Sequence, residues 1–156
     1  MMLDWLVLAR AAHVLGVVVW IGGVGFVTAV LLPGIRGIDD IDRRAELFER
    51  LEGRFAWIAR GATLLVGASG FYMVEQYDLW DRFANITFWW MHAMVAVWAI
   101  FTIMLFVAEP LFLHRWFAER LRDRPERTFA LIQRAHWILF LLSALTIFAA
   151  VAGAHG

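Results

Sequence analysis

The fold of this chain is decided by the apolar stretch ITFWWMHAMVAVWAIFTIMLFV, residues Ile86–Val107. It holds no Asp, Glu, Lys or Arg, and at ~1.5 Å per helical residue it is long enough to cross a hydrocarbon layer of ~30 Å. Its one ionisable side chain is His92. An imidazole at that depth loses its water and needs a partner: a hydrogen bond, a metal or a cofactor. Ala96 and Ala99 continue the face of His92 and favour either a groove for a flat macrocycle or a closely packed helix.

The composition is typical of a membrane protein, and we predict a single domain over residues 1–156. Of the 156 residues 62% are hydrophobic and 18% are charged, and the mean hydropathy is +0.69. The absence of cysteine excludes disulfides and thiolate metal sites, so a metal or haem must be held by His, Met, Glu or the backbone. All 14 basic residues are arginine, which excludes lysine Schiff-base chemistry. A formal net charge of zero gives no reason to expect a nucleic acid as partner.

Four apolar runs predict an all-α fold, an integral membrane four-helix up-down bundle. We expect the third helix to continue past the membrane to about Arg122, with a bend near Pro110, and Pro125 to begin the last helix. The expected spans are Leu3–Leu32, a retained helix ended by Pro33 and Gly34; Phe55–Glu75; Ile86–Val107; and about Glu126–Gly153.

The charged stretch Asp39–Arg54 lies between the first two expected spans. Within it Ile41, Phe48 and Leu51 recur at helical spacing, and Asp39 or Asp40 can cap the helix. The pattern predicts a short amphipathic helix at the cytoplasmic membrane interface.

Arginine asymmetry predicts the orientation of the bundle. Only Arg10 and Arg82 belong to one side, while the two connections on the other side hold the remaining arginines. By the positive-inside rule both long connections are cytoplasmic and both termini are outside. The arginine-rich connections contain Arg36, Arg43, Arg44, Arg50 and Arg54, with Arg60 just inside the second span, and Arg115, Arg120, Arg122, Arg124, Arg127 and Arg134.

This orientation places two histidines at similar depth. His13 lies about ten residues, and His92 about six residues, from the outer ends of their spans, so at ~1.5 Å per residue their depths agree to within about 6 Å. Two imidazoles from two helices at one level are what bis-histidine ligation of haem b requires. Arg10, one turn outward of His13, can pair with a haem propionate. His114 and His136, at the cytoplasmic end, can hold a second haem, and a structural or proton-relay role remains the alternative for each histidine.

Copper is a different possibility for the same region. Met91, His92 and Met94 provide thioethers and an imidazole, which suit Cu(I). These three side chains point in different directions around one helix, so a second helix must help to complete such a site.

The residues also resemble a known family. The stretches RAAHVLGVVVWIGGVGF and RFAWIARGATLLVGASGF resemble the four-helix membrane module of the copper-resistance D family and of the four-helix bacterial protoporphyrinogen oxidases. In the oxidase relatives the first-helix histidine is associated with haem, which maps to His13. Their third helix carries Leu-His-x-Lys, where this chain has Met91-His92-Ala93-Met94. The histidine is kept and the lysine is absent, so the resemblance implies a haem-binding bundle more than protoporphyrinogen oxidation.

We therefore expect a haem b-binding redox protein of a bacterial inner membrane, multi-pass, with both termini periplasmic. Its partners are expected to be the lipid bilayer and either a quinone or a redox partner protein. A copper-handling protein and a protoporphyrinogen oxidase-like enzyme are the alternatives. The sequence leaves open the electron donor and acceptor, whether a substrate is turned over, and whether the chain forms a homo-oligomer.

Overall fold

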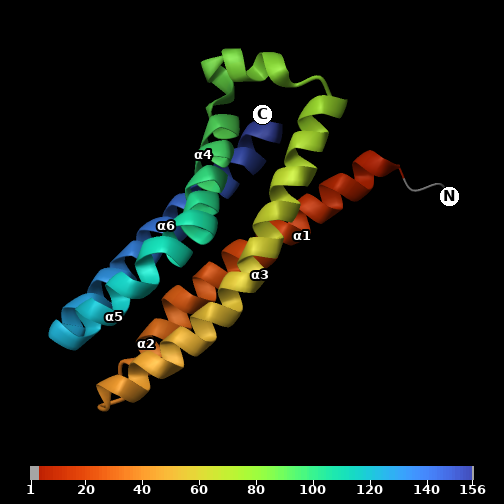
Figure 1. The fold of residues 1–156 in the computed structure, drawn as a ribbon. Helices are drawn as coiled ribbons and strands as arrows, with labels where there is room; N and C mark the ends of the chain where they lie inside the picture. The colour runs from red at the N-terminus through yellow and green to blue at the C-terminus, as the bar shows by residue number, and fades with distance from the viewer. Residues whose placement is uncertain (1–3, 156) are drawn as a thin grey trace.

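The computed structural model describes residues 4–155, apart from the side chains of residues 114, 118, 121, 122, 154 and 155, and every element in this range is helical. Successive long helical segments alternate in direction, and the two ends of the chain lie toward the same end of the molecule (Figure 1). The elements are α1 (Trp5–Phe26), η1 (Val27–Leu31), α2 (Leu32–Ile35), α3 (Ile41–Gln76), η2 (Trp80–Ala84), η3 (Ile86–Phe88), α4 (Trp89–Ile103), η4 (Met104–Leu113), α5 (His114–Asp123) and α6 (Pro125–His155).

Three of the described helical segments are long and apolar enough to cross a membrane: Trp5–Ile35, Ile86–Leu113 and Pro125–Gly153. They expose much of their apolar surface, including Val18, Ile138 and Phe148. Such surface is costly in water and suits a lipid environment. The chain is therefore all-helical with the features of a membrane protein.

The first helix does not end at Pro33, so the predicted stop is wrong. The backbone widens into the π-helical turn η1 and continues through Pro33 to Ile35. In a π-helical turn each N–H donates to the carbonyl five residues earlier, so residue 33 would donate to the Thr28 carbonyl. Proline has no N–H and cannot make this bond. Gln133 of α6 donates its side-chain amide to that carbonyl instead, at 2.7 Å. A neighbouring helix thus replaces the hydrogen bond that proline removes.

The predicted separate amphipathic helix is also wrong. Asp40 caps α3, accepting from the amides of Asp42 and Arg43, and the helix then runs unbroken for 36 residues. Its inner face is covered by protein rather than by a membrane surface, because the Phe48 ring packs 5.4 Å from Phe117 and 6.0 Å from Phe129. The apolar stripe of this segment therefore belongs to the core of the molecule.

The predicted extension of the third helix is confirmed, since helical backbone continues from Trp89 to Asp123. Pro110 lies inside the π-helical segment η4. The amide that proline lacks would have donated to the Leu105 carbonyl at five-residue spacing. Arg60 of α3 donates its Nε–H to that carbonyl at 3.0 Å, so this proline too is compensated by a neighbouring helix.

Two apolar clusters join the helices. In one, Trp20 of α1 meets Phe101 of α4 edge to face with ring centroids 4.8 Å apart, between small residues of α3. The other lies around Phe48 and Phe129, where α2, α3, α5 and α6 meet. α1 packs along α3, and α4 packs along α6.

Candidate functional site

His13 lies on the face of α1 that packs against α3. Its Nδ1 is 3.0 Å from the Val66 carbonyl oxygen and 3.1 Å from the Ser69 hydroxyl. A side chain at Gly70 would bring a Cβ atom to 3.2 Å from the imidazole Cε1, so the glycine makes room for the ring. The segment of α3 around Val66, Ser69 and Gly70 thus holds the His13 ring, and we call it the His13 seat.

The hydrogen bonds assign the tautomer of His13. The Val66 carbonyl can only accept, so Nδ1 must carry the hydrogen, and the Ser69 hydroxyl donates its own hydrogen toward Leu65 at 2.6 Å. The lone pair of the neutral ring then lies on Nε2, for which no hydrogen-bond partner is found among the described residues. A ring oriented through Nδ1–H and a backbone carbonyl, with Nε2 free, is the usual state of a metal-ligating histidine.

His92 lies in the first turn of α4 and is exposed, whereas the sequence predicts a buried ring. The 3₁₀ turn η3 replaces the expected helical start at Ile86, so His92 is near the beginning of its α-helix. Its Nε2 lies 3.0 Å from the Phe83 carbonyl oxygen, and its ring meets Phe83 edge to face at 5.5 Å. Nε2 must donate to that carbonyl, which leaves the lone pair on Nδ1.

The other predicted residues are dispersed. No hydrogen bond or ring contact joins His13 to His92 among the described residues. Arg10, exposed near the start of α1, donates to the Tyr77 hydroxyl at 2.8 Å, and its guanidinium lies 5.9 Å from the centre of that ring. His136 of α6 uses Nδ1 to bond the Ile132 carbonyl of its own helix at 3.0 Å. The side chain of His114 lies outside the described residues.

Among the described residues no group of three or more His, Asp or Glu side chains converges on a possible metal position. Met91 is buried and Met94 half-buried, while His92 is exposed. The three therefore face different surroundings, as their spacing predicts.

A polar cluster that the sequence analysis missed lies between α3 and η4. Arg60 Nη2 is 3.1 Å from Glu109 Oε2, both side chains being largely buried, and the Arg60 guanidinium stacks 4.8 Å from the Trp57 ring centre. Glu52 lies near this pair, and burial raises its pKa to about 7, with repulsion by Glu109 adding to the effect. In the sequence, Pro110 could have indicated this cluster. A proline at this position leaves the Leu105 carbonyl without a backbone donor, so another donor is needed.

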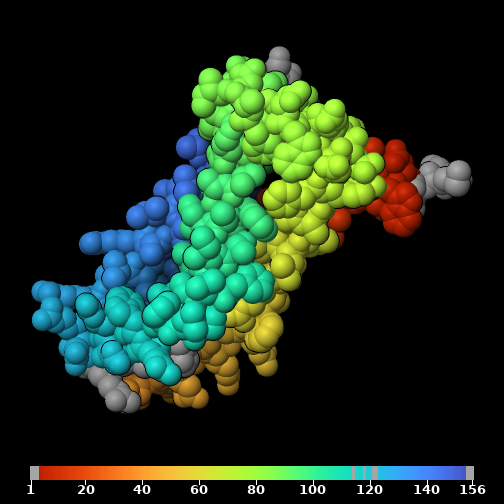
Figure 2. All heavy atoms as spheres, turned by 45° about the horizontal axis from the view of Figure 1, so that its top comes forward, coloured from red at the N-terminus to blue at the C-terminus, as the bar shows by residue number. Residues whose placement is uncertain are grey.

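A hollow separates α3 and α4 near the connection between them in the space-filling view (Figure 2).

Comparison of the chain with family models, curated proteins and solved structures yields no match.

Proposed function

We propose that this chain is a four-span membrane protein that binds haem b beside the seat of His13 and takes part in electron transfer. The membrane placement is supported by the three long apolar helices and their exposed apolar side chains. In this arrangement α3 is the fourth span, and its charged first half extends from the membrane on the cytoplasmic side. Arg60, the most deeply placed cation of α3, is neutralised by Glu109.

The observation that carries the haem proposal is the hydrogen-bonded state of His13. Its ring is held by α3 through Nδ1, and the Nε2 lone pair would be available to bind the haem iron. The hollow between α3 and α4 lies at the end of the bundle to which the α3–α4 connection belongs (Figure 2).

We propose that His92 would hold the haem iron together with His13. Because Nε2 carries the hydrogen in this structure, ligation through Nε2 would require the proton to move to Nδ1 and would cost the hydrogen bond to Phe83, worth about 1 kcal/mol. When bound, a bis-histidine haem supplies a one-electron redox centre. The protein would orient it through His13, exclude water with its apolar helices, and place Arg10 and Tyr77 near the outer end for a propionate. The donor would be a lipid-soluble quinol and the acceptor a redox partner.

The test is the absorption spectrum of protein purified from membranes of cells supplied with haem. The wild type should show a Soret band and a reducible α-band. His13→Ala and His92→Ala should each lower haem content several-fold or give a five-coordinate high-spin spectrum. His155→Ala is the control and should leave the spectrum unchanged, and His136→Ala tests the opposite end of the bundle.

Two results would contradict the proposal. If the His13→Ala and His92→Ala proteins both kept a low-spin spectrum while His136→Ala lost it, the haem would lie at the opposite end of the bundle. If metal analysis found copper and no porphyrin, the copper-handling alternative would replace the haem protein.

A further inference from the structure

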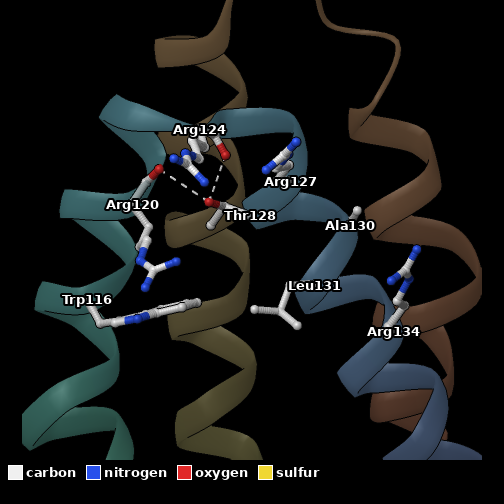
Figure 3. A pocket seen from close by; sticks show the side chains of 8 residues that line it. All are labelled: Trp116, Arg120, Arg124, Arg127, Thr128, Ala130, Leu131 and Arg134. Atoms are coloured by element: carbon white, nitrogen blue, oxygen red, sulfur yellow. Dashed lines mark hydrogen bonds between the residues drawn. The ribbon is translucent and has the colours of Figure 1, made fainter.

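A basic pocket lies at the turn between α5 and α6, away from the His13 seat. It has a volume of about 480 Å³ and is lined by Trp116, Arg120 and Arg124 on one side and by Arg127, Leu131 and Arg134 on the other. Figure 3 shows Arg124 and Arg127 at the turn, and Trp116 and Leu131 farther along the two helices. Arg120 lies beside Trp116, and Arg134 lies farther along α6 than Leu131, so cationic and apolar side chains line the pocket together.

The geometry of the pocket is supported by contacts across the turn. The Thr128 hydroxyl lies 2.9 Å from the Arg124 carbonyl and 3.2 Å from that of Arg120, tying the start of α6 to the end of α5. The Arg120 guanidinium is held 5.5 Å from the centre of the Trp116 ring. Stacking on an aromatic face leaves the donor edge of a guanidinium available to an anion.

None of the four pocket arginines forms an ion pair within the described part of the chain. The two ion pairs found there, Arg44–Glu126 and Arg60–Glu109, involve none of the four pocket arginines. Four guanidinium groups around one cavity repel each other and attract a multivalent oxyanion, above all a phosphate.

An apolar stripe leads from the pocket along α6. Leu131, Ile138 and Leu145 are spaced seven residues apart, so they lie on one helix face, and each is at least half exposed. A ligand that fills the pocket and follows this stripe has a phosphate at one end and a long hydrocarbon chain at the other. Neither a free phosphate nor an acidic peptide has both parts.

We propose that this pocket binds the headgroup of an anionic glycerophospholipid, whose acyl chains lie along the exposed face of α6. The inference rests on the membrane placement proposed above and is independent of haem. Bound in this way the lipid would neutralise the arginines of the α5–α6 turn and anchor that turn at the membrane surface. Basic pockets at the cytoplasmic side of membrane spans bind anionic lipid headgroups in general.

The test is native mass spectrometry of the purified chain in neutral detergent, with phosphatidylglycerol, phosphatidylcholine or inorganic phosphate added at equal concentration. Phosphatidylglycerol should bind with defined stoichiometry, and phosphatidylcholine should bind at least about tenfold more weakly. The triple variant Arg120→Gln, Arg124→Gln, Arg127→Gln should lose this preference. The matched control, Arg36→Gln, Arg43→Gln, Arg50→Gln, removes three exposed arginines from the other connection and should keep it.

If the pocket variant does not fold, Arg127→Glu and its control Arg43→Glu provide the same comparison with one substitution each. Equal loss in pocket and control variants would overturn the proposal, because the attraction would then be nonspecific. Inorganic phosphate that displaced the lipid at equal concentration would also overturn it, since the acyl chains would contribute nothing. Failure of the membrane placement is detected separately, by recovery of the chain outside the membrane fraction.

Discussion

Gly67 illustrates how single residues position the helices. A Cβ atom at this position would lie 2.7 Å from the Trp98 ring, whose Nε1–H donates to the Thr63 carbonyl at 2.9 Å. Gly153 approaches the Trp90 ring as closely, with a Cβ distance of 2.6 Å. At these positions glycine allows a large aromatic ring from a neighbouring helix to lie against the backbone.

Gly67→Ala should therefore destabilise the protein by about 1–3 kcal/mol, because Trp98 must shift and weaken its hydrogen bond. Gly61→Ala is the matched control in the same helix, since nothing lies within 4 Å of a Cβ there, and it should be neutral or stabilising. The measurement is thermal unfolding in detergent. Equal effects of the two substitutions would show that Trp98 does not pack as described.

Glu52 makes stability depend on pH. Burial, with repulsion from Glu109 and Glu49 and partial compensation by Arg60, raises its pKa from 4.5 to about 7. The folded chain thus binds this proton more tightly than the unfolded chain, and the stability present below pH 4.5 is lost as the pH rises toward 7 and beyond.

Glu52→Gln should raise the melting temperature at pH 8 by about 5 °C and change it little at pH 4.5, where the wild-type carboxyl is largely protonated in the folded state. Thermal unfolding at both pH values tests this, with the exposed Glu46→Gln of the same helix as control. A gain of equal size at both pH values would contradict the assignment.

At the scale of elements, the two prolines within long helices are accommodated in the same way. Each lies in or directly after a π-helical segment, and in each case a side chain from a neighbouring helix donates to the carbonyl five residues earlier: Gln133 to Thr28 and Arg60 to Leu105. Each proline therefore makes the backbone hydrogen bonding of its own helix depend on a side chain of a neighbouring helix.

A double-mutant cycle tests this coupling at η4. Arg60→Gln should cost about 2–4 kcal/mol, because it leaves Glu109 and the Leu105 carbonyl without their partner. In a Pro110→Ala background the cost should be smaller by about 1 kcal/mol, since the new amide can donate to that carbonyl. Urea unfolding in detergent provides the free energies, and strict additivity would argue against the coupling.

At the scale of the whole molecule, the alternation of helix directions determines which connections share a side (Figure 1). If α3 spans the membrane despite its charges, reporter fusions after Gly34 and after Arg124 should both report a cytoplasmic location, and a fusion after Asp81 should report the outside. A cytoplasmic signal after Asp81 would show that α3 does not cross, and an outside signal after Gly34 would reverse the orientation.

Much of the helical content was predictable because it depends on local sequence. Hydropathy and helical spacing predict the apolar segments, the continuation past Pro110 and the turn before Pro125, and Asp40 is a local capping signal. These features involve residues within a few positions of each other, so no knowledge of the neighbouring helices is required.

The remaining features depend on which helix lies opposite, and only the tertiary structure decided them. The passage of the first helix through Pro33 requires Gln133, 105 residues away from Thr28, and the orientation of His13 requires Val66, 53 residues away. The hydrogen-bond partner of His92 follows from the way η2 places the Phe83 carbonyl beside it. The sequence by itself determined where the apolar segments lie and that most of the chain is helical. Packing between distant segments determined the hydrogen-bond partners of each histidine, and hence which ring nitrogen is free, because a buried donor or acceptor takes whichever partner the neighbouring helix presents.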